Sequence, residues 1–301
     1  MVSLYRIWQM ALWEWGCAIR SRRALVVIAL YLVCAVLCMN GSVSVLSKME
    51  AELTEVLQLP AADSTGVVSK ALWNSKPFAR LVRAVVGGGP VLDDIFGRHP
   101  VELLYAWFAF LCTPLLAMLV SATRVSDDLR SGAVRYMMVR MSRLEWALGK
   151  YVGQTMMVLA AMAVSSLGAA AVAFFLLSPG TAASLVWPML GWGARAWLYS
   201  LSWIGIALGV SHLTRSPGRA SAIGVFAVCV FGVIGASLGT LQAKFGWPEA
   251  VLHLEGLLPS SSQPALWRFS WQPVAAGTFH LLVLGLSYLM AGVAIMMRKD
   301  V

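Results

Sequence analysis

The sequence predicts an all-α, polytopic membrane protein, and three observations lead to that prediction. Of its 301 residues, 59% are apolar and only 12% are charged, whereas soluble domains have about 45–50% apolar and about 25% charged residues. The mean hydropathy of +0.75 points the same way. The apolar residues also gather into separate runs of about 20 residues, the length of a helix that crosses a bilayer. A water-soluble core is therefore excluded.

Residues 1–23 are expected to form an interfacial helix before the first span. Tryptophan is frequent there, and apolar residues recur at helical spacing, so that one face is apolar. Such a helix lies in the plane of the membrane surface; a solvated amphipathic helix is the alternative. The apolar positions are Leu4, Ile7, Trp8, Ala11, Leu12, Trp15 and Ile19.

Six apolar runs follow, and each is expected to cross the membrane as a helix. Pro114 falls inside the second run, where neighbouring helices can satisfy the carbonyl group that a proline leaves free. Together they make one transmembrane domain that spans 1–301. The expected spans are 24–45, 101–123, 151–177, 192–213, 220–241 and 275–297.

Two long segments, 41–100 and 242–273, connect the spans on the outer side. The first has a charged stretch and a helical stripe of apolar residues, so we expect helical pieces within it. The second places tryptophans between prolines, a pattern typical of short helices at the outer interface. Neither segment contains a low-complexity tract.

The basic residues are distributed unevenly across the expected topology. The chain has 23 Lys and Arg against 14 Asp and Glu. The termini and the loops after spans 2 and 4 hold 14 of the basic residues and only 5 acidic ones, while the opposite side is balanced. By the positive-inside rule, both termini are cytoplasmic. The excess charge is therefore a topology signal and does not indicate a nucleic-acid partner.

Motifs of catalysis and metal binding are lacking in the sequence. The only Gly-Lys pair, Gly149-Lys150, is followed by Tyr151, so a phosphate-binding loop is not formed. The four histidines lie far apart, and the five cysteines show no disulfide or zinc spacing. Ionisable residues are sparse inside the spans, which disfavours an ion-driven transporter. We therefore expect no catalytic residue, no metal site and no cofactor in this chain.

Small residues are arranged for close helix packing. The pairs Gly149/Gly153, Gly205/Gly209 and Gly235/Gly239 each form a G-x-x-x-G motif, which lets two helices approach closely. Packing within one chain is the simpler interpretation. A homodimer interface at one of the pairs is the alternative.

Residues 124–150 join the second and third spans on the cytoplasmic side. Apolar residues there are interleaved with arginines, and Ser142 precedes Glu145 by three positions, the spacing of a capping box. We expect two short amphipathic helices broken near Met141 and Ser142, the second running into the third span. The alternative is a solvated basic loop bound to anionic lipid head groups.

This segment resembles the type-2 permeases of ATP-binding-cassette (ABC) transporters. Those proteins have an acidic residue and then a glycine after their second span, followed by a short turn and a Leu-Gly-Lys start of the third span. The corresponding residues here are Asp127, Asp128, Leu129, Gly132, Met141-Ser142-Arg143 and Trp146-Ala147-Leu148-Gly149-Lys150. Met141 departs from the family, which often has proline there.

The resemblance covers nearly the whole chain. The loop Leu213–Ala220 is a second local match, and the order of spans, the inner termini and the first helix also fit. The long first outer loop is most similar to the copper-enzyme-maturation subgroup.

The resemblance implies that residues 124–150 are a coupling region that docks into a cleft on a separate ABC ATPase subunit. Arginines there would pair with acidic groups, while Met137, Met138 and Val139 would fill the cleft. The implied docking residues are Asp128, Gly132, Arg135, Met137, Met138, Arg140, Ser142, Arg143 and Glu145. The implied second contact consists of Arg215 and Arg219.

The working unit implied by the resemblance contains two permease copies, as a homodimer, and an ATPase dimer. ATP and Mg would bind to the ATPase, so the chain itself is not an enzyme. We expect a multi-pass permease subunit of the bacterial inner membrane that couples ATP hydrolysis to export or to a conformational change.

Several alternatives remain open at this point. Within the class, a mechanotransmitting permease would move no solute and would act on a periplasmic partner through the outer loops. From another class, a membrane anchor or assembly subunit would lack coupling to an ATPase. A membrane-embedded enzyme is disfavoured, because polar residues do not cluster in the sequence. The substrate is not specified by any motif.

Overall fold

The computed structural model describes residues 3–57, 90–95, 98–177, 179–245 and 255–298. Within these ranges the chain is built of helices and contains no strand, so the predicted all-α class is confirmed. Most of the segment 41–100 lies outside the described residues, as does part of the segment 242–273.

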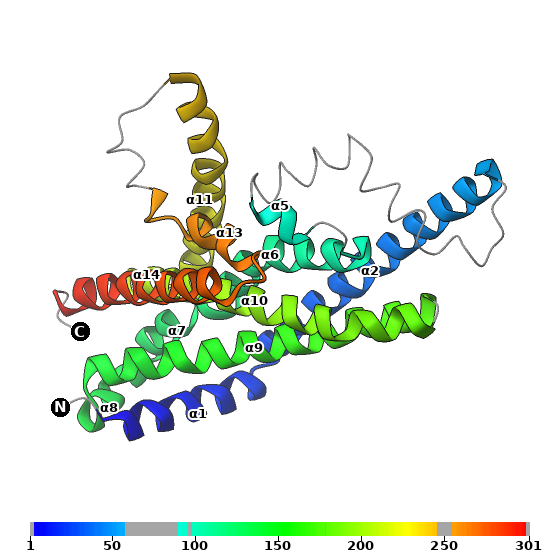
Figure 1. Ribbon diagram of the computed structural model, residues 1–301. Helices are drawn as coiled ribbons and strands as arrows, with labels where there is room; N and C mark the ends of the chain where they lie inside the picture. Colours follow the sequence, from blue (N-terminus) through cyan, green and yellow to red (C-terminus); the bar gives the residue numbers. More distant parts are fainter. Residues whose placement is uncertain (1–2, 58–89, 96–97, 178, 246–254, 299–301) are drawn as a thin grey trace.

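Long helices make up the body of the molecule (Figure 1). The second helix continues to Leu57, beyond the expected end of the first span at residue 45. These elements are α1 (Leu4–Arg20), α2 (Arg22–Leu57), α6 (Pro100–Ser121), α9 (Arg143–Leu176), α10 (Pro179–Ser211), α11 (Pro217–Phe245) and α14 (Trp271–Met297). The shorter elements are α5 (Pro90–Ile95), α7 (Arg124–Ser131), α8 (Ala133–Arg140), η1 (Pro259–Ser262) and α13 (Gln263–Leu266).

Five helical stretches among the described residues are long and apolar enough to cross a membrane. They correspond to expected spans one, two, three, five and six. Those stretches are Ala24–Lys48, Pro100–Ser131, Arg143–Leu176, Pro217–Gly235 and Trp271–Met297. The chain is therefore a multi-pass membrane protein, while six crossings remain a prediction.

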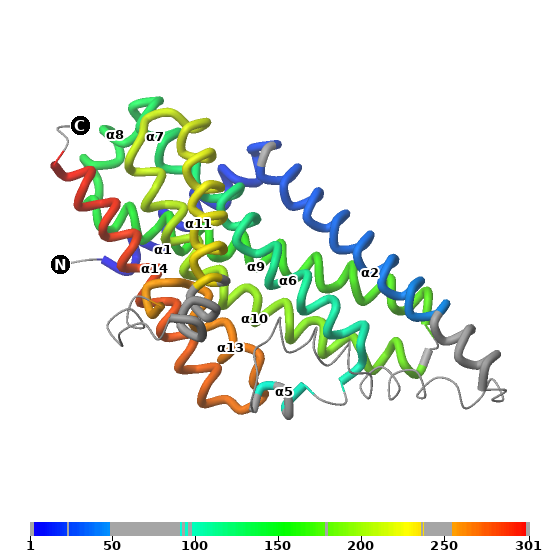
Figure 2. The backbone as a smooth tube through the Cα atoms, turned by 90° about the horizontal axis from the view of Figure 1, so that it is seen from above, coloured from blue at the N-terminus to red at the C-terminus, as the bar shows by residue number. Residues whose placement is uncertain are grey.

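The remaining expected span, 192–213, lies on α10, which occupies the centre of the bundle. This helix contacts α6, α9 and α14 (Figure 2). Ser200, Ser202 and Trp203 on α10 are buried. This helix is the one expected span that is not among the stretches apolar enough to cross a membrane within the described residues.

Glycines allow α10 and α14 to pack backbone against backbone. A Cβ atom added at Gly205 would lie 2.0 Å from the carbonyl oxygen of Gly285, and one added at Gly292 would lie 2.7 Å from Gly209. On α9, a Cβ at Gly149 would lie 2.4 Å from Cβ of Met10 on α1. These G-x-x-x-G motifs therefore serve packing within the chain, as the simpler interpretation predicted.

The first helix packs along the start of α9 (Figure 1). Its apolar residues divide between two faces: Ile7 and Ala11 are buried, whereas Leu4, Trp8 and Leu12 are exposed. Part of the predicted apolar surface of this helix therefore contacts the rest of the protein, and the exposed part is suited to the membrane surface.

The connection before α14 contains η1 and α13, which pack against α10, α11 and α14. Trp267 is fully buried there, with its ring centroid 4.8 Å from that of Trp192 and 5.2 Å from that of Phe110. The indole N–H of Trp192 donates to the buried Glu102 carboxylate at 2.8 Å. The tryptophans expected at an outer interface thus include one that closes the bundle.

We expect the mutation Gly205→Ala to destabilise the protein by about 1–3 kcal/mol, because the new methyl group would force α10 and α14 apart. The matched control is Gly191→Ala on the same helix, where a Cβ has no neighbour within 4 Å. Thermal unfolding in detergent checks both variants. Equal midpoints for the two would contradict the close packing of α10 on α14.

Candidate functional site

The segment between α6 and α9 folds into two short helices, α7 and α8, joined at Gly132. This glycine has φ of +74°, the left-handed conformation that ends a helix without the Cβ penalty of other residues. The sequence predicted the break at Met141 and Ser142, but it did not predict this earlier turn. The turn at Gly132 separates the segment into two helices with different surroundings.

A capping box begins α9 and confirms the predicted spacing. The backbone N–H of Glu145 donates to Oγ of Ser142 at 3.2 Å, and the backbone N–H of Ser142 donates to Oε2 of Glu145 at 2.8 Å. Oε1 of Glu145 accepts the backbone N–H of Ser3 at 2.7 Å, so the same carboxylate also fixes the start of α1.

The helix α8 presents its side chains to the outside. Tyr136 and Val139 are 82% and 85% exposed, and Arg135 and Arg140 are exposed beside them. A groove of about 780 Å³ runs between α8 and α1. The groove is lined by Arg6, Gln9, Met10, Trp13, Ala133, Tyr136, Met137, Val139, Arg140 and Met141. This surface combines apolar and cationic groups, a composition suited to an acidic protein partner.

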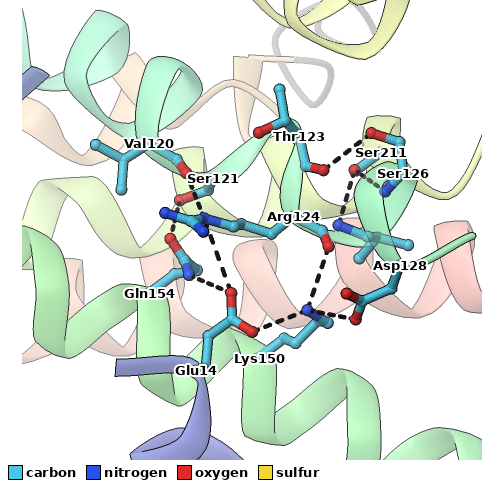
Figure 3. A network of polar contacts seen from close by, with 11 residues as sticks. Glu14, Val120, Ser121, Thr123, Arg124, Ser126, Asp128, Lys150, Gln154 and Ser211 are labelled. Carbon is cyan, nitrogen blue, oxygen red and sulfur yellow. Dashed lines mark hydrogen bonds and ion pairs between the residues drawn. The ribbon is translucent and has the colours of Figure 1, made fainter. Parts of the chain in front are cut away.

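The helix α7 is tied to its neighbours by a buried ion cluster, shown in Figure 3. The ammonium group of Lys150 on α9 lies 2.9 Å from Oε2 of Glu14 on α1 and 2.8 Å from Oδ2 of Asp128 on α7. It also donates to the carbonyl oxygen of Arg124 at 3.2 Å. Lys150 is only 1% exposed. One cation therefore joins three helices.

The second oxygen of Glu14 completes the cluster. Its Oε1 accepts a hydrogen bond from Nε2 of Gln154 at 2.9 Å and lies 3.8 Å from Nε of Arg124. Glu14 and Asp128 thus face Lys150 and Arg124, and the charges of the cluster balance. Burial, reinforced by the negative charge of Glu14, raises the pKa of the Cys17 thiol one turn along α1. Glu14 itself is only 2% exposed, so the cluster is shielded from water.

The start of α7 is capped by Ser211, the last residue of the central helix α10. Oγ of Ser211, at the end of α10, accepts the backbone N–H groups of Val125 at 3.2 Å and Ser126 at 2.9 Å (Figure 3). These N–H groups have no partner within the first turn of a helix. The cap couples the position of α7 directly to α10.

The predicted docking residues fall into two groups in the structure. Arg135 and Arg140 lie on the exposed helix α8, Ser142 is exposed just after it, and Met137, Met138 and Arg143 are half-buried nearby. Asp128 and Glu145 point inward, into the ion cluster and the capping box. Arg215 and Arg219 are exposed at the connection of α10 to α11, two helices that both contact α7.

The sequence prediction missed most members of the ion cluster. The signal that was available is a charge set among apolar residues: Glu14 lies between two tryptophans, and Lys150 directly precedes the third expected span. The missed members of the cluster are Glu14, Arg124, Lys150 and Gln154, and the capping residue Ser211 was also missed.

These features define a multi-pass membrane component with a structured segment exposed beyond one end of its bundle. Over residues 8–296 the chain matches the family described as ABC-2 family transporter protein, and it belongs to that family. It is thus a permease component of an ABC transporter. A comparison with curated proteins finds no significant match. The copper-enzyme-maturation subgroup stays a prediction.

We expect Gly132→Ala to weaken the turn between α7 and α8 by about 1–2 kcal/mol, because a side chain is strained at positive φ. Steric crowding does not contribute to this effect, since a Cβ at Gly132 would meet no atom within 4 Å. Hydrogen exchange of the backbone amides in α8 checks the prediction. Gly16→Ala on α1 is the control, because a Cβ there also meets nothing; equal exchange in both variants would contradict the argument.

Proposed function

We propose that this chain couples ATP hydrolysis by a separate ATPase subunit to movement of its membrane helices. The observation that carries the proposal is the division of residues 124–140 into an exposed helix α8 and an inner helix α7 that is tied to α1, α9 and α10. A docked ATPase would contact α8, and the contacts of α7 with α1, α9 and α10 would transmit a displacement of α8 to the membrane helices.

The chemistry of α8 and its groove supports a protein as the docked partner. Tyr136 and Val139 offer apolar anchors, and aromatic anchors at the centre of a contact contribute much of its binding energy. Arg135 and Arg140 would steer an acidic surface toward them. Arg215 and Arg219 would form a smaller second contact. ATP and Mg would be bound by the partner, and this chain would carry out no catalysis.

The working assembly in this proposal is a pair of permease copies with a pair of ATPase subunits in a bacterial inner membrane. The exposed apolar residues of α11, such as Phe226 and Val233, would face lipid or the second copy. Transport would run outward, as export. The balance between two states of the bundle would be shifted by nucleotide binding to the partner.

One observation favours a second function, transmission of force to a periplasmic partner without solute transport. Asp94 on α5, within the outer segment 41–100, forms an ion pair with Arg268 beside the buried Trp267. The outer segment is therefore attached to the part of the chain that closes the bundle. Periplasmic proteins captured by crosslinking at Asp94→Cys, with no solute flux in liposomes, would favour this function.

We expect the double variant Arg135→Glu, Arg140→Glu to bind the co-purifying ATPase at least about tenfold more weakly, because the steering charges are reversed. Affinity is measured with the permease in nanodiscs, together with the stimulation of ATPase turnover. Arg298→Glu is the matched control, since Arg298 is also exposed but follows α14.

Unchanged affinity in the double variant would refute docking at α8. Failure of any ATPase to co-purify with the native chain from its own membranes would refute the proposed function as a whole and would favour the membrane-anchor alternative.

A further inference from the structure

The ion cluster around Lys150 has no direct part in docking in this proposal, because its central pair is buried and the side chains of Arg124 and Asp128 are only 14% exposed. Glu14 and Lys150 are 2% and 1% exposed. We propose that Lys150 is a positioning residue that joins α1, α7 and the start of α9 into one rigid unit, so that displacement of α8 reaches the membrane helices. This inference rests on the proposed function and names the group that transmits the movement.

The first argument is that the ammonium group has three close oxygen partners. It donates to Oε2 of Glu14 at 2.9 Å and to the carbonyl oxygen of Arg124 at 3.2 Å, and it forms an ion pair with Oδ2 of Asp128 at 2.8 Å. Because the group is buried, each lost acceptor would leave a donor without water to replace it. Loss of any one of these partners would therefore weaken the attachment of the ammonium group.

The second argument is that the contacts connect separate elements. Glu14 belongs to α1, Lys150 to α9, and both Asp128 and Arg124 to α7. By contrast, the neighbouring ion pair of Asp127 with Arg130, at 3.7 Å, lies within α7 and is exposed. Asp127 and Asp128 are thus adjacent carboxylates of the same helix, and only the second one joins α7 to other helices.

The third argument is that the shape of α9 brings Glu14 to Lys150. A Cβ at Gly153 would lie 3.0 Å from Cβ of Glu14, and one at Gly149 would lie 2.4 Å from Cβ of Met10. Side chains at these two positions would hold α1 away from α9. The glycines therefore set the close approach at which the carboxylate meets the ammonium group.

The fourth argument concerns where the movement goes. The Ser211 hydroxyl at the end of α10 accepts two N–H groups of α7, so α7 cannot shift without either moving α10 or breaking this cap. Because α10 contacts α6, α9 and α14, a displacement of the rigid unit would reach the centre of the bundle.

The experiment compares Asp128→Asn with Asp127→Asn in the full chain in nanodiscs. Both variants remove one negative charge from α7 with nearly the same shape. We expect Asp128→Asn to keep the affinity for the co-purifying ATPase and to lose about tenfold of the stimulation of ATPase turnover. Asp127→Asn should retain both, and Asp128→Glu, which keeps the charge, should recover much of the stimulation.

A second arm tests the rigid unit without any ATPase. Hydrogen exchange in the permease alone should rise about tenfold in both α1 and α7 for Asp128→Asn and stay unchanged for Asp127→Asn. If Asp128→Asn does not assemble, Glu14→Gln replaces it, because it removes a different acceptor of the same ammonium group.

The outcomes separate the inference from the proposed function. Full stimulation in Asp128→Asn, or faster exchange in α7 without a change in α1, overturns the role of Lys150. A parallel loss of affinity and stimulation in Asp128→Asn would also overturn it, since that result indicates a role in stability alone. If native protein binds no ATPase, the proposed function fails, and the exchange arm still decides whether the rigid unit exists.

Discussion

The buried ammonium group of Lys150 is the constraint on which the arrangement of α1, α7 and α9 in this permease depends. Moving an ion from water to a medium of low dielectric costs on the order of 20 kcal/mol in the ideal case, and the cost is offset only by close, well-oriented partners. Here the partners come from α1 and α7. Removal of either helix would take a charged partner away from the ammonium group, so the three elements stabilise one another's positions.

This constraint gives the two helices after α6 opposite characters. The carboxylate of Asp128 and the first N–H groups of α7 are used internally, by Lys150 on one side and by Ser211 on the other, whereas α8 directs Tyr136 and Val139 outward. Gly132 lies between them in a left-handed conformation. A partner can therefore bind α8 without competing for the contacts that hold α7, which is the arrangement that a transmitting element requires.

How much the sequence predicted depended on the range of each interaction. The apolar runs and the capping box of Ser142 and Glu145 are local patterns, so the all-α class and the start of α9 were predicted correctly. Lys150 and Glu14 are separated by 136 positions, and their contact follows from the packing of α1 on α9. No local pattern encodes it. The turn at Gly132 was missed because a single glycine is also tolerated inside a helix, so its presence alone does not mark a helix end.

The helix α10 shows why composition alone is an incomplete guide to the bundle. Its serines and tryptophans lower its apolar character, yet it contacts α6, α9 and α14 and receives the cap contact with α7. A helix surrounded by protein can carry indole groups, because neighbouring helices supply acceptors, as the indole N–H of Trp197 donates to the carbonyl oxygen of Thr155 on α9 at 2.9 Å. The expected span that is not apolar enough on its own to be assigned a crossing is therefore the one that connects α7 with α6, α9 and α14.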